Sequence, residues 1–311
     1  MKKGFVLIST LALILILSFL VLLLSKTIYT DTLKTNIYST SIEKRIEMIN
    51  IEKILIETFI SNSDRLRNVQ LAEGELNFIV NSKIPDLLIE LDDLSTCFNL
   101  NSLVKPFRNI YVKNELVGER FKNFLKVSEI ERIKHREFLD RLYDSLDTDN
   151  LPEPFGAEDL FYISNESLSL SPDQPYIHKS QIKNLSFLND NEILQIYSNI
   201  CALPHNETLF NINGLSEQNY LVLLSLLPDL SLNDIEKLII NRPPEGYINY
   251  ANVINLSGIN EDRIDSSILI YKPEYLQINY SLELEGQLFY FYSVISLKTR
   301  NNNVIHRSTS L

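Results

Sequence analysis

Glycine and proline, the residues that most often interrupt helices, are nearly missing from the first quarter of the chain. After Gly4 the next glycine is Gly74, and the first proline is Pro85. Nothing in this stretch stops a helix once it has begun. We therefore expect one long N-terminal helix from about Phe5 to about Phe59, ending in a polar cluster at 61–64.

Cysteines are few, and basic residues are outnumbered. The 311 residues include two cysteines. There are 29 Lys and Arg against 40 Asp and Glu, which gives a formal net charge of -11. This balance argues against a nucleic-acid partner, because phosphate binding needs clustered Lys and Arg. Cys97 and Cys201 form no C-x-x-C motif, which argues against a redox enzyme. A disulfide between them and two buried free thiols are equally compatible with the sequence.

Motifs of enzyme active sites are also missing. The chain has no G-x-S-x-G, no P-loop and no H-E-x-x-H. Its four histidines are scattered and show no metal-ligand spacing: His135, His178, His205 and His306. We therefore expect a protein that is not an enzyme.

What the sequence does contain is a long apolar run at its start. From Phe5 to Ser25 there is no charged residue, and about 20 apolar residues are enough for a helix to cross a bilayer. Lys2 and Lys3 precede the run, so the N-terminus is expected in the cytoplasm and the remainder outside.

A small residue, Gly4, stands between these lysines and the run, whereas an ordinary signal peptide is cut after its apolar run. Lys-Gly-Phe at this place resembles the type IV prepilin signal, which implies cleavage after Gly4 and a new N-terminus at Phe5. From this stretch alone, a plain uncleaved anchor is equally compatible.

Beyond Lys26 one apolar stripe continues along the helix. An amphipathic face must bury against another layer, so we expect the exported half of the helix to pack on a sheet. The stripe consists of residues spaced by three to five positions: Leu33, Ile37, Ile42, Ile46 and Ile49.

Strand patterns occur near both ends of the exported region. The early ones are 75–81 and 85–91, and the later ones are 275–284, 288–297 and 304–307, with turns at 285–286 and 301–303. The residues between these two groups read as helices, over 118–126, 127–146, 189–200, 217–227 and 232–240. The pattern predicts an α+β protein whose antiparallel sheet is interrupted by a helical insertion.

Acidic residues gather inside this insertion. Calcium takes six to eight oxygen ligands from carboxylates and carbonyls, but the order here does not match an EF-hand. The spacing alone favours a solvated acidic loop, with some carboxylates capping helices, over a metal site. The calcium candidates are Asp144, Asp147, Asp149, Glu158 and Asp159.

Two Asn-x-Asn motifs form a short internal repeat. They are Phe98-Asn-Leu-Asn101 and Phe210-Asn-Ile-Asn213. Asparagine side chains favour turns and helix caps, so we expect each motif to start a helix. The helical pair over 211–242 has the outline of a helix-hairpin-helix, but its hairpin has no glycine and carries Asp229. We therefore exclude DNA binding.

The prepilin-like start, the D-x-D of Asp147 and Asp149, the Gly-Ala-Glu-Asp step at 156–159 and the two Asn-x-Asn motifs occur together. This combination resembles the K-type minor pseudopilins of bacterial type II secretion systems, the general secretion pathway protein K family. The resemblance runs from residue 1 to about residue 259. It departs from the family at Ser145, where tryptophan is usual, and at Gly214, where threonine is usual.

The resemblance implies a pseudopilin fold. Residues 1–4 would be the leader, 5–60 the N-terminal helix with 5–25 in the membrane, 61–102 and 270–311 the sheet, and 103–269 the inserted helical domain. It also implies cleavage between Gly4 and Phe5 by a prepilin peptidase, N-methylation of Phe5, and structural calcium bound to the exported domain.

The family also implies a cellular role. Its members sit at the tip of the pseudopilus, in machinery that exports folded proteins across the outer membrane. The implied location is the inner membrane, with a single span and a periplasmic C-terminal domain. The implied partners are the I-type and J-type minor pseudopilins, the major pseudopilin and membrane lipid.

Ser9 adds a physical reason for the tip position. Most pilins and pseudopilins carry a glutamate at the fifth mature residue, which here is Ser9. A glutamate within hydrocarbon is costly without a partner, and a subunit at the tip has no subunit above it to supply one. Two alternatives are a minor pilin of a type IV pilus and a single-pass anchored periplasmic adaptor, which would keep Met1.

Overall fold

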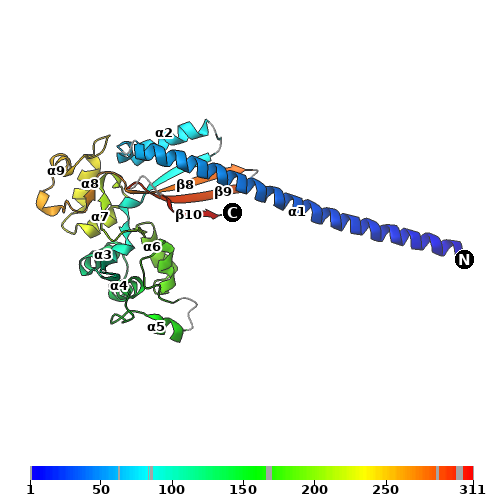
Figure 1. The fold of residues 1–311 in the computed structure, drawn as a ribbon, viewed down its shortest axis with the longest axis horizontal. Coiled ribbons are helices and arrows are strands. Elements are labelled where there is room, and N and C mark those ends of the chain that lie inside the picture. The colour runs from blue at the N-terminus through cyan, green and yellow to red at the C-terminus, as the bar shows by residue number, and fades with distance from the viewer. Residues whose placement is uncertain are drawn as a thin grey trace.

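A single helix, α1 (Lys2–Ser61), dominates the shape of the molecule. The computed structural model describes residues 2–61, 64–82, 84, 87–165, 170–284, 287–298 and 304–310. Within them, residues 9–59 of α1 are long and apolar enough to cross a membrane, by length and composition. Figure 1 shows most of α1 projecting from the body toward the N-terminus. The long uninterrupted helix expected from the missing breakers is thus confirmed.

Only about the last four turns of α1 enter the core. The buried side chains there are Met48, Leu55, Ile56 and Phe59. Most of the apolar stripe before them is exposed to solvent, since Ile42 is 45% and Ile46 is 56% exposed. A 60-residue helix is about 90 Å long, whereas ten-residue strands span about 33 Å. The exported half of α1 therefore packs on the sheet as expected, but only from Met48 onward, because the helix is much longer than the strands.

The sheet on which α1 ends has four antiparallel strands in the order β1-β8-β9-β10. They are β1 (Leu87–Asp93), β8 (Tyr275–Leu284), β9 (Gln287–Ser296) and β10 (Val304–Ser310). The predicted C-terminal meander is confirmed in its strands. The turns expected at 285–286 and 301–303 lie outside the described residues, as does the start of the strand expected from Pro85.

The strand expected over 75–81 is wrong. These residues belong to a helix, α2 (Val69–Asn81), whose first turn is capped by the Asn68 side chain. Ala72, Leu76 and Val80 are buried at four-residue spacing, so the period is that of a helix. Gly74 lies within α2, because a helix tolerates one glycine at a cost of about 1 kcal/mol.

The helical insertion lies between β1 and β8. Its helices confirm the expected class, although the helix expected from residue 127 begins at Arg132 and residues 200–201 form a short strand. Figure 1 shows α3 to α6 and α7 to α9 as two groups. The helices are α3 (Glu115–Val127), α4 (Arg132–Leu146), α5 (Asp159–Ser164), α6 (Asp190–Tyr197), α7 (Tyr220–Leu226), α8 (Leu232–Ile240) and α9 (Tyr250–Ser257).

Short strands and 3-10 helices lie between the longer elements. They are the strands β2 (Phe98–Asn99), β3 (Val104–Phe107), β4 (Ile110–Lys113), β5 (Ile200–Cys201), β6 (Phe210–Asn211) and β7 (Leu269–Ile270), and the 3-10 helices η1 (Arg65–Arg67), η2 (Leu94–Thr96), η3 (Leu100–Leu103), η4 (Lys179–Leu185), η5 (Ile212–Gly214) and η6 (Glu261–Arg263).

The Asn-x-Asn motifs organise the two groups of helices in the same way. Each first asparagine ends a two-residue strand in a parallel pair, β2 with β5 and β6 with β7, and caps the 3-10 helix that follows. Each second asparagine is buried and clamps two distant loops. Asn101 bonds to Tyr176 and to the Leu203 carbonyl, and Asn213 bonds to Tyr247 and to the Tyr271 carbonyl. Their expected structural role is thus observed.

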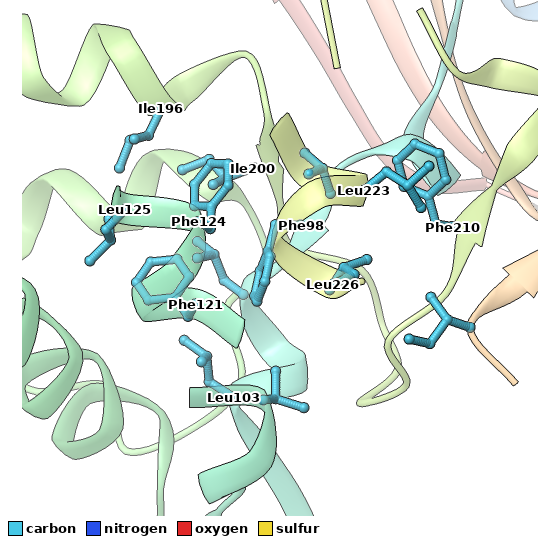
Figure 2. Close-up of a cluster of buried hydrophobic side chains, with 14 of the residues drawn as sticks. Phe98, Leu103, Phe121, Phe124, Leu125, Ile196, Ile200, Phe210, Leu223 and Leu226 are labelled. Atoms are coloured by element: carbon cyan, nitrogen blue, oxygen red, sulfur yellow. The ribbon is translucent and has the colours of Figure 1, made fainter. Parts of the chain in front are cut away.

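One hydrophobic core joins the two groups. Phe98, Phe121 and Phe124 pack with ring centroids 5.2 to 5.9 Å apart. Figure 2 shows Phe98 between these rings and Leu226 of the second group. The insertion is therefore packed as one body beside the sheet.

Candidate metal centre

The acidic residues of the insertion converge where α4 ends and α5 begins. Asp144 lies in the last turn of α4, Asp147 caps its C-terminus, and Glu158 is the residue before α5. All three are buried, while Asp149 is exposed. One carboxylate oxygen from each of Asp147, Asp149 and Glu158 lies within 4.8 Å of the other two.

Several carboxylate oxygens in this cluster lack a donor. Asp144 Oδ1 accepts from the Glu153 amide at 2.9 Å. Among the described residues, however, no donor reaches Asp144 Oδ2, Asp147 Oδ1, either oxygen of Glu158, or Oδ1 of Asp173. An unpaired buried charge is costly. The arrangement therefore calls for a positive charge in its centre.

Burial and mutual repulsion change the acidity of the cluster. Desolvation raises the pKa of Asp144 to about 6, and desolvation followed by neighbouring carboxylates raises that of Asp147 to about 7 and that of Glu158 to about 8. Without a cation, these groups hold protons that ordinary carboxyls release near pH 4. A bound cation would reverse this tendency.

The donor set fits a hard cation. It consists of carboxylate oxygens, which suits calcium better than the softer metals that prefer nitrogen or sulfur. Gly156 closes the cluster, because a Cβ there would lie 1.8 Å from Asp144 Oδ2. The site thus depends on a glycine as well as on acids.

The structure gathers some of the expected ligands and not others. Asp144, Asp147, Asp149 and Glu158 come together, whereas Asp159 starts α5 and accepts from the Ser171 amide at 3.1 Å. Asp173, which sequence reasoning missed, raises the pKa of both Asp147 and Glu158. In the sequence Asp173 is a single acidic residue after Ser171-Pro172. Its distance from residues 144–159 along the chain gave no indication that it joins their cluster.

The other site residues lie elsewhere. The structure joins Cys97 to Cys201 in a disulfide, with their Cα atoms 5.8 Å apart. The bond ties the end of η2 to β5, next to Tyr275 of β8. Gly4 and Phe5 are helical in α1, and their side chains fall outside what the structure describes.

Comparisons with known proteins agree with this architecture. The chain superposes on one chain of the crystal structure of the GspK-GspI-GspJ complex from the enterotoxigenic Escherichia coli type 2 secretion system. The TM-score is 0.62 with 16% identity, and the match covers 85% of this chain and 99% of that chain. The fold is therefore that of a pseudopilin, with a long helix on an antiparallel sheet and a helical insertion.

Sequence comparisons find similarity to one family. The model for type II secretion system (T2SS) protein K matches residues 96–205. Curated relatives include the putative type II secretion system protein K of Escherichia coli K12 (28% identical, 51% of this chain and 49% of that protein) and protein K of Aeromonas hydrophila (27%, 50% and 49%). Protein K of Pectobacterium carotovorum is 23% identical over 70% of this chain and 68% of its own length.

The chain is therefore similar to type II secretion system protein K, in sequence over residues 96–205 and in fold over most of its length. The matched part spans about half the length of the first two of these relatives.

Proposed function

We propose that this protein is the minor pseudopilin at the tip of a type II secretion pseudopilus, a structural subunit without catalytic activity. One observation carries the proposal. The described side chains of α1 from residue 9 to residue 47 make no contribution to the buried core, although the first part of this segment is strongly apolar. A helix of this kind needs lipid around its first half and other helices around its second half.

The bulk of the insertion supports the tip position. Figure 1 shows the helical insertion at the end of α1 away from the N-terminus. A subunit stacked above would have to displace it. Ser9 also supports the tip position. It stands where most pilins carry a glutamate, so the membrane segment offers no carboxylate to pair with the terminal amine of a further subunit.

The N-terminus supports a place in the inner membrane with one span. Lys2 and Lys3 would hold the N-terminus in the cytoplasm, and the domain beyond the membrane would be periplasmic. A prepilin peptidase would cut between Gly4 and Phe5, and Phe5 would then be N-methylated.

The acidic cluster is proposed to bind calcium through Asp144, Asp147, Asp149, Glu158 and Asp173. The ion would supply the charge that the buried oxygens lack, and it would tie the end of α4 to the start of α5. Its role would be structural, and it would hold the outermost loop of the insertion in one conformation.

The proposed partners are the I-type and J-type minor pseudopilins, with the major pseudopilin below them. The protein K in the GspK-GspI-GspJ complex assembles with two such subunits. The exposed residues of α1 beyond the membrane offer the apolar surface for them. The I-type and J-type subunits from the same cell should therefore co-purify with the full-length chain.

A matched pair of variants makes this test specific. Ile46→Glu places a charge on the bare face of α1, at a residue 56% exposed, and Ile133→Glu does so on α4, at a residue 84% exposed. Ile46→Glu should lose both partners and Ile133→Glu should keep them. A chain that always purifies alone, or equal loss in the two variants, would contradict tip assembly.

A further inference from the structure

Three side chains from distant parts of the chain meet where the insertion contacts the sheet. His178 precedes η4 in the insertion, Tyr292 lies on β9 and His306 lies on β10. The Nε2 atoms of both histidines lie 3.3 Å from the Tyr292 hydroxyl oxygen. A β-bulge between Val304 and His306 sets the position of His306. The insertion and the last two strands of the sheet are thus joined through two titratable rings.

The cap of η4 determines where the protons of this group lie. His178 Nδ1 accepts from the Ser180 amide at 3.2 Å and lies 2.8 Å from the Ser180 hydroxyl. The proton of the neutral ring is therefore on Nε2, which donates to the Tyr292 oxygen. Tyr292 in turn donates its own proton to His306 Nε2. The result is a directed chain of hydrogen bonds in which both imidazoles are neutral.

Protonation of either ring breaks this chain. A second proton on His178 occupies Nδ1, so the ring no longer accepts from the Ser180 amide and η4 loses that cap. A proton on His306 Nε2 turns this nitrogen into a donor, and the Tyr292 hydroxyl then loses the acceptor of its own proton. The two ring centroids are 5.4 Å apart, so two cationic rings would also repel each other. Each added proton therefore weakens the contact.

The charges around His178 also oppose its protonation. Burial is the main cause that lowers the pKa of His178, and His306 and Lys179 lower it further. Among the described residues, no carboxylate contributes to this shift. Asp92 of β1 acts on Lys179, whose Nζ donates to the Tyr197 carbonyl at 2.9 Å.

The other titratable groups near Tyr292 are tyrosines. They are Tyr197 of α6 and Tyr290 of β9, and burial raises the pKa of both, so they are uncharged near neutral pH. A histidine that holds fewer protons in the folded contact than in the open state makes the contact less stable as the pH falls. The group therefore favours the closed contact at neutral pH and the open one in acid.

We propose that His178, Tyr292 and His306 form a pH-sensitive latch between the insertion and the sheet. The latch is closed at neutral pH, and it opens below about pH 6, where imidazoles take up protons. Opening releases η4 from β9 and β10, while the disulfide between Cys97 and Cys201 still holds the insertion beside the sheet.

The test is hydrogen exchange of the full-length protein in detergent, read by mass spectrometry at pH 7.5 and pH 5 and corrected for the intrinsic exchange rates. EGTA is present, because the acidic cluster then gains protons and stability at pH 5 and cannot cause a loss of protection. Peptides over η4 and β10 report the latch. A peptide over α8 reports a distant helix and shows that each variant is folded.

In the wild type, the protection of η4 and β10 should fall at least about fivefold from pH 7.5 to pH 5, because each pKa unit between the closed and open states changes the opening equilibrium tenfold. The protection of α8 should stay the same. His178→Asn keeps a good cap for η4 without a titratable ring, and His306→Gln removes the other imidazole. The double variant should therefore show no pH response in η4 or β10.

The control is His205→Asn, which removes a histidine whose ring stacks on Tyr275 instead. It should respond to acid as the wild type does. Equal protection of η4 and β10 at the two pH values in the wild type would overturn the proposal, as would an undiminished loss in the folded double variant.

Discussion

Arg307 on the last strand binds Glu52 on α1 across 255 positions of sequence. The guanidinium Nε lies 3.2 and 3.1 Å from the two oxygens of the Glu52 carboxylate. Glu52 is completely buried, while 36% of the Arg307 side chain is exposed. The pair fastens the C-terminal strand to the helix that carries the protein in the membrane.

This asymmetry predicts unequal effects of two substitutions. Arg307→Ala leaves a buried carboxylate without a partner, which should lower the free energy of unfolding by about 3 kcal/mol. Glu52→Ala leaves an arginine that can turn to water, and should cost about half as much. Urea denaturation of the full-length protein in detergent measures both. A larger loss in Glu52→Ala than in Arg307→Ala would contradict this account of the pair.

Calcium should stabilise the folded protein. At a hundred times its Kd, a ligand that binds only the folded state adds about 2.7 kcal/mol. Asp147→Asn and Glu158→Gln should abolish the rise in melting temperature with calcium. In EGTA at pH 8, where the wild-type carboxyls ionise, both substitutions should raise the melting temperature because a buried charge is gone.

Asp159→Asn is the control for these variants, because its oxygen can still accept from the Ser171 amide. It should respond to calcium as the wild type does. The proposed ligand set would be wrong if Asp147→Asn and Glu158→Gln kept the full calcium response.

Stability without calcium should fall as the pH rises. The folded-state pKa values, about 6 for Asp144, about 7 for Asp147 and about 8 for Glu158, exceed those of unfolded carboxyls near 4. The folded state therefore holds more protons, and the stability that they contribute is lost between about pH 4 and pH 8.

Melting temperatures in EGTA should thus decline from pH 5 to pH 8, and Glu158→Gln should flatten the decline. Calcium should remove it, because the metal binds the ionised carboxylates. A calcium-free melting temperature that rises over this range would show that the cluster is not buried as described.

Two glycines should respond in opposite directions to alanine. A Cβ on Gly156 would lie 1.8 Å from Asp144 Oδ2, so Gly156→Ala should displace this carboxylate and weaken calcium binding. Gly74 in α2 has nothing within 4 Å of a new Cβ, and Gly74→Ala should stabilise the protein by about 0.5 to 1 kcal/mol. Calcium titration and urea denaturation of both variants check the pair. Equal calcium affinity in Gly156→Ala and wild type would contradict the close approach.

The sequence predicted what depends on local pattern. Missing breakers predicted α1, alternation predicted β8 and β9, and the period of 232–240 predicted α8 within its observed bounds. The error at 75–81 arose because a short apolar stretch can fit either period. Asn68, which caps α2, is the residue in the sequence that would have indicated a helix.

Contacts between distant segments could not be predicted in this way. The Glu52–Arg307 pair and the group of His178, Tyr292 and His306 both depend on the register of β10, which a single bulge sets. Asp173 joins the acidic cluster through a loop that spacing does not describe. Four of the acidic candidates were found because they are close in sequence, and Asp159 was included for the same reason although its carboxylate is engaged elsewhere.

The mature N-terminus tests the central claim most directly. Intact-mass and N-terminal peptide mass spectrometry of the protein from its native cells would read it. We predict a chain that begins at Phe5 with a methylated amine, and Gly4→Ala should block this processing. A wild-type chain that begins at Met1 would contradict the pseudopilin function and leave an uncleaved membrane anchor.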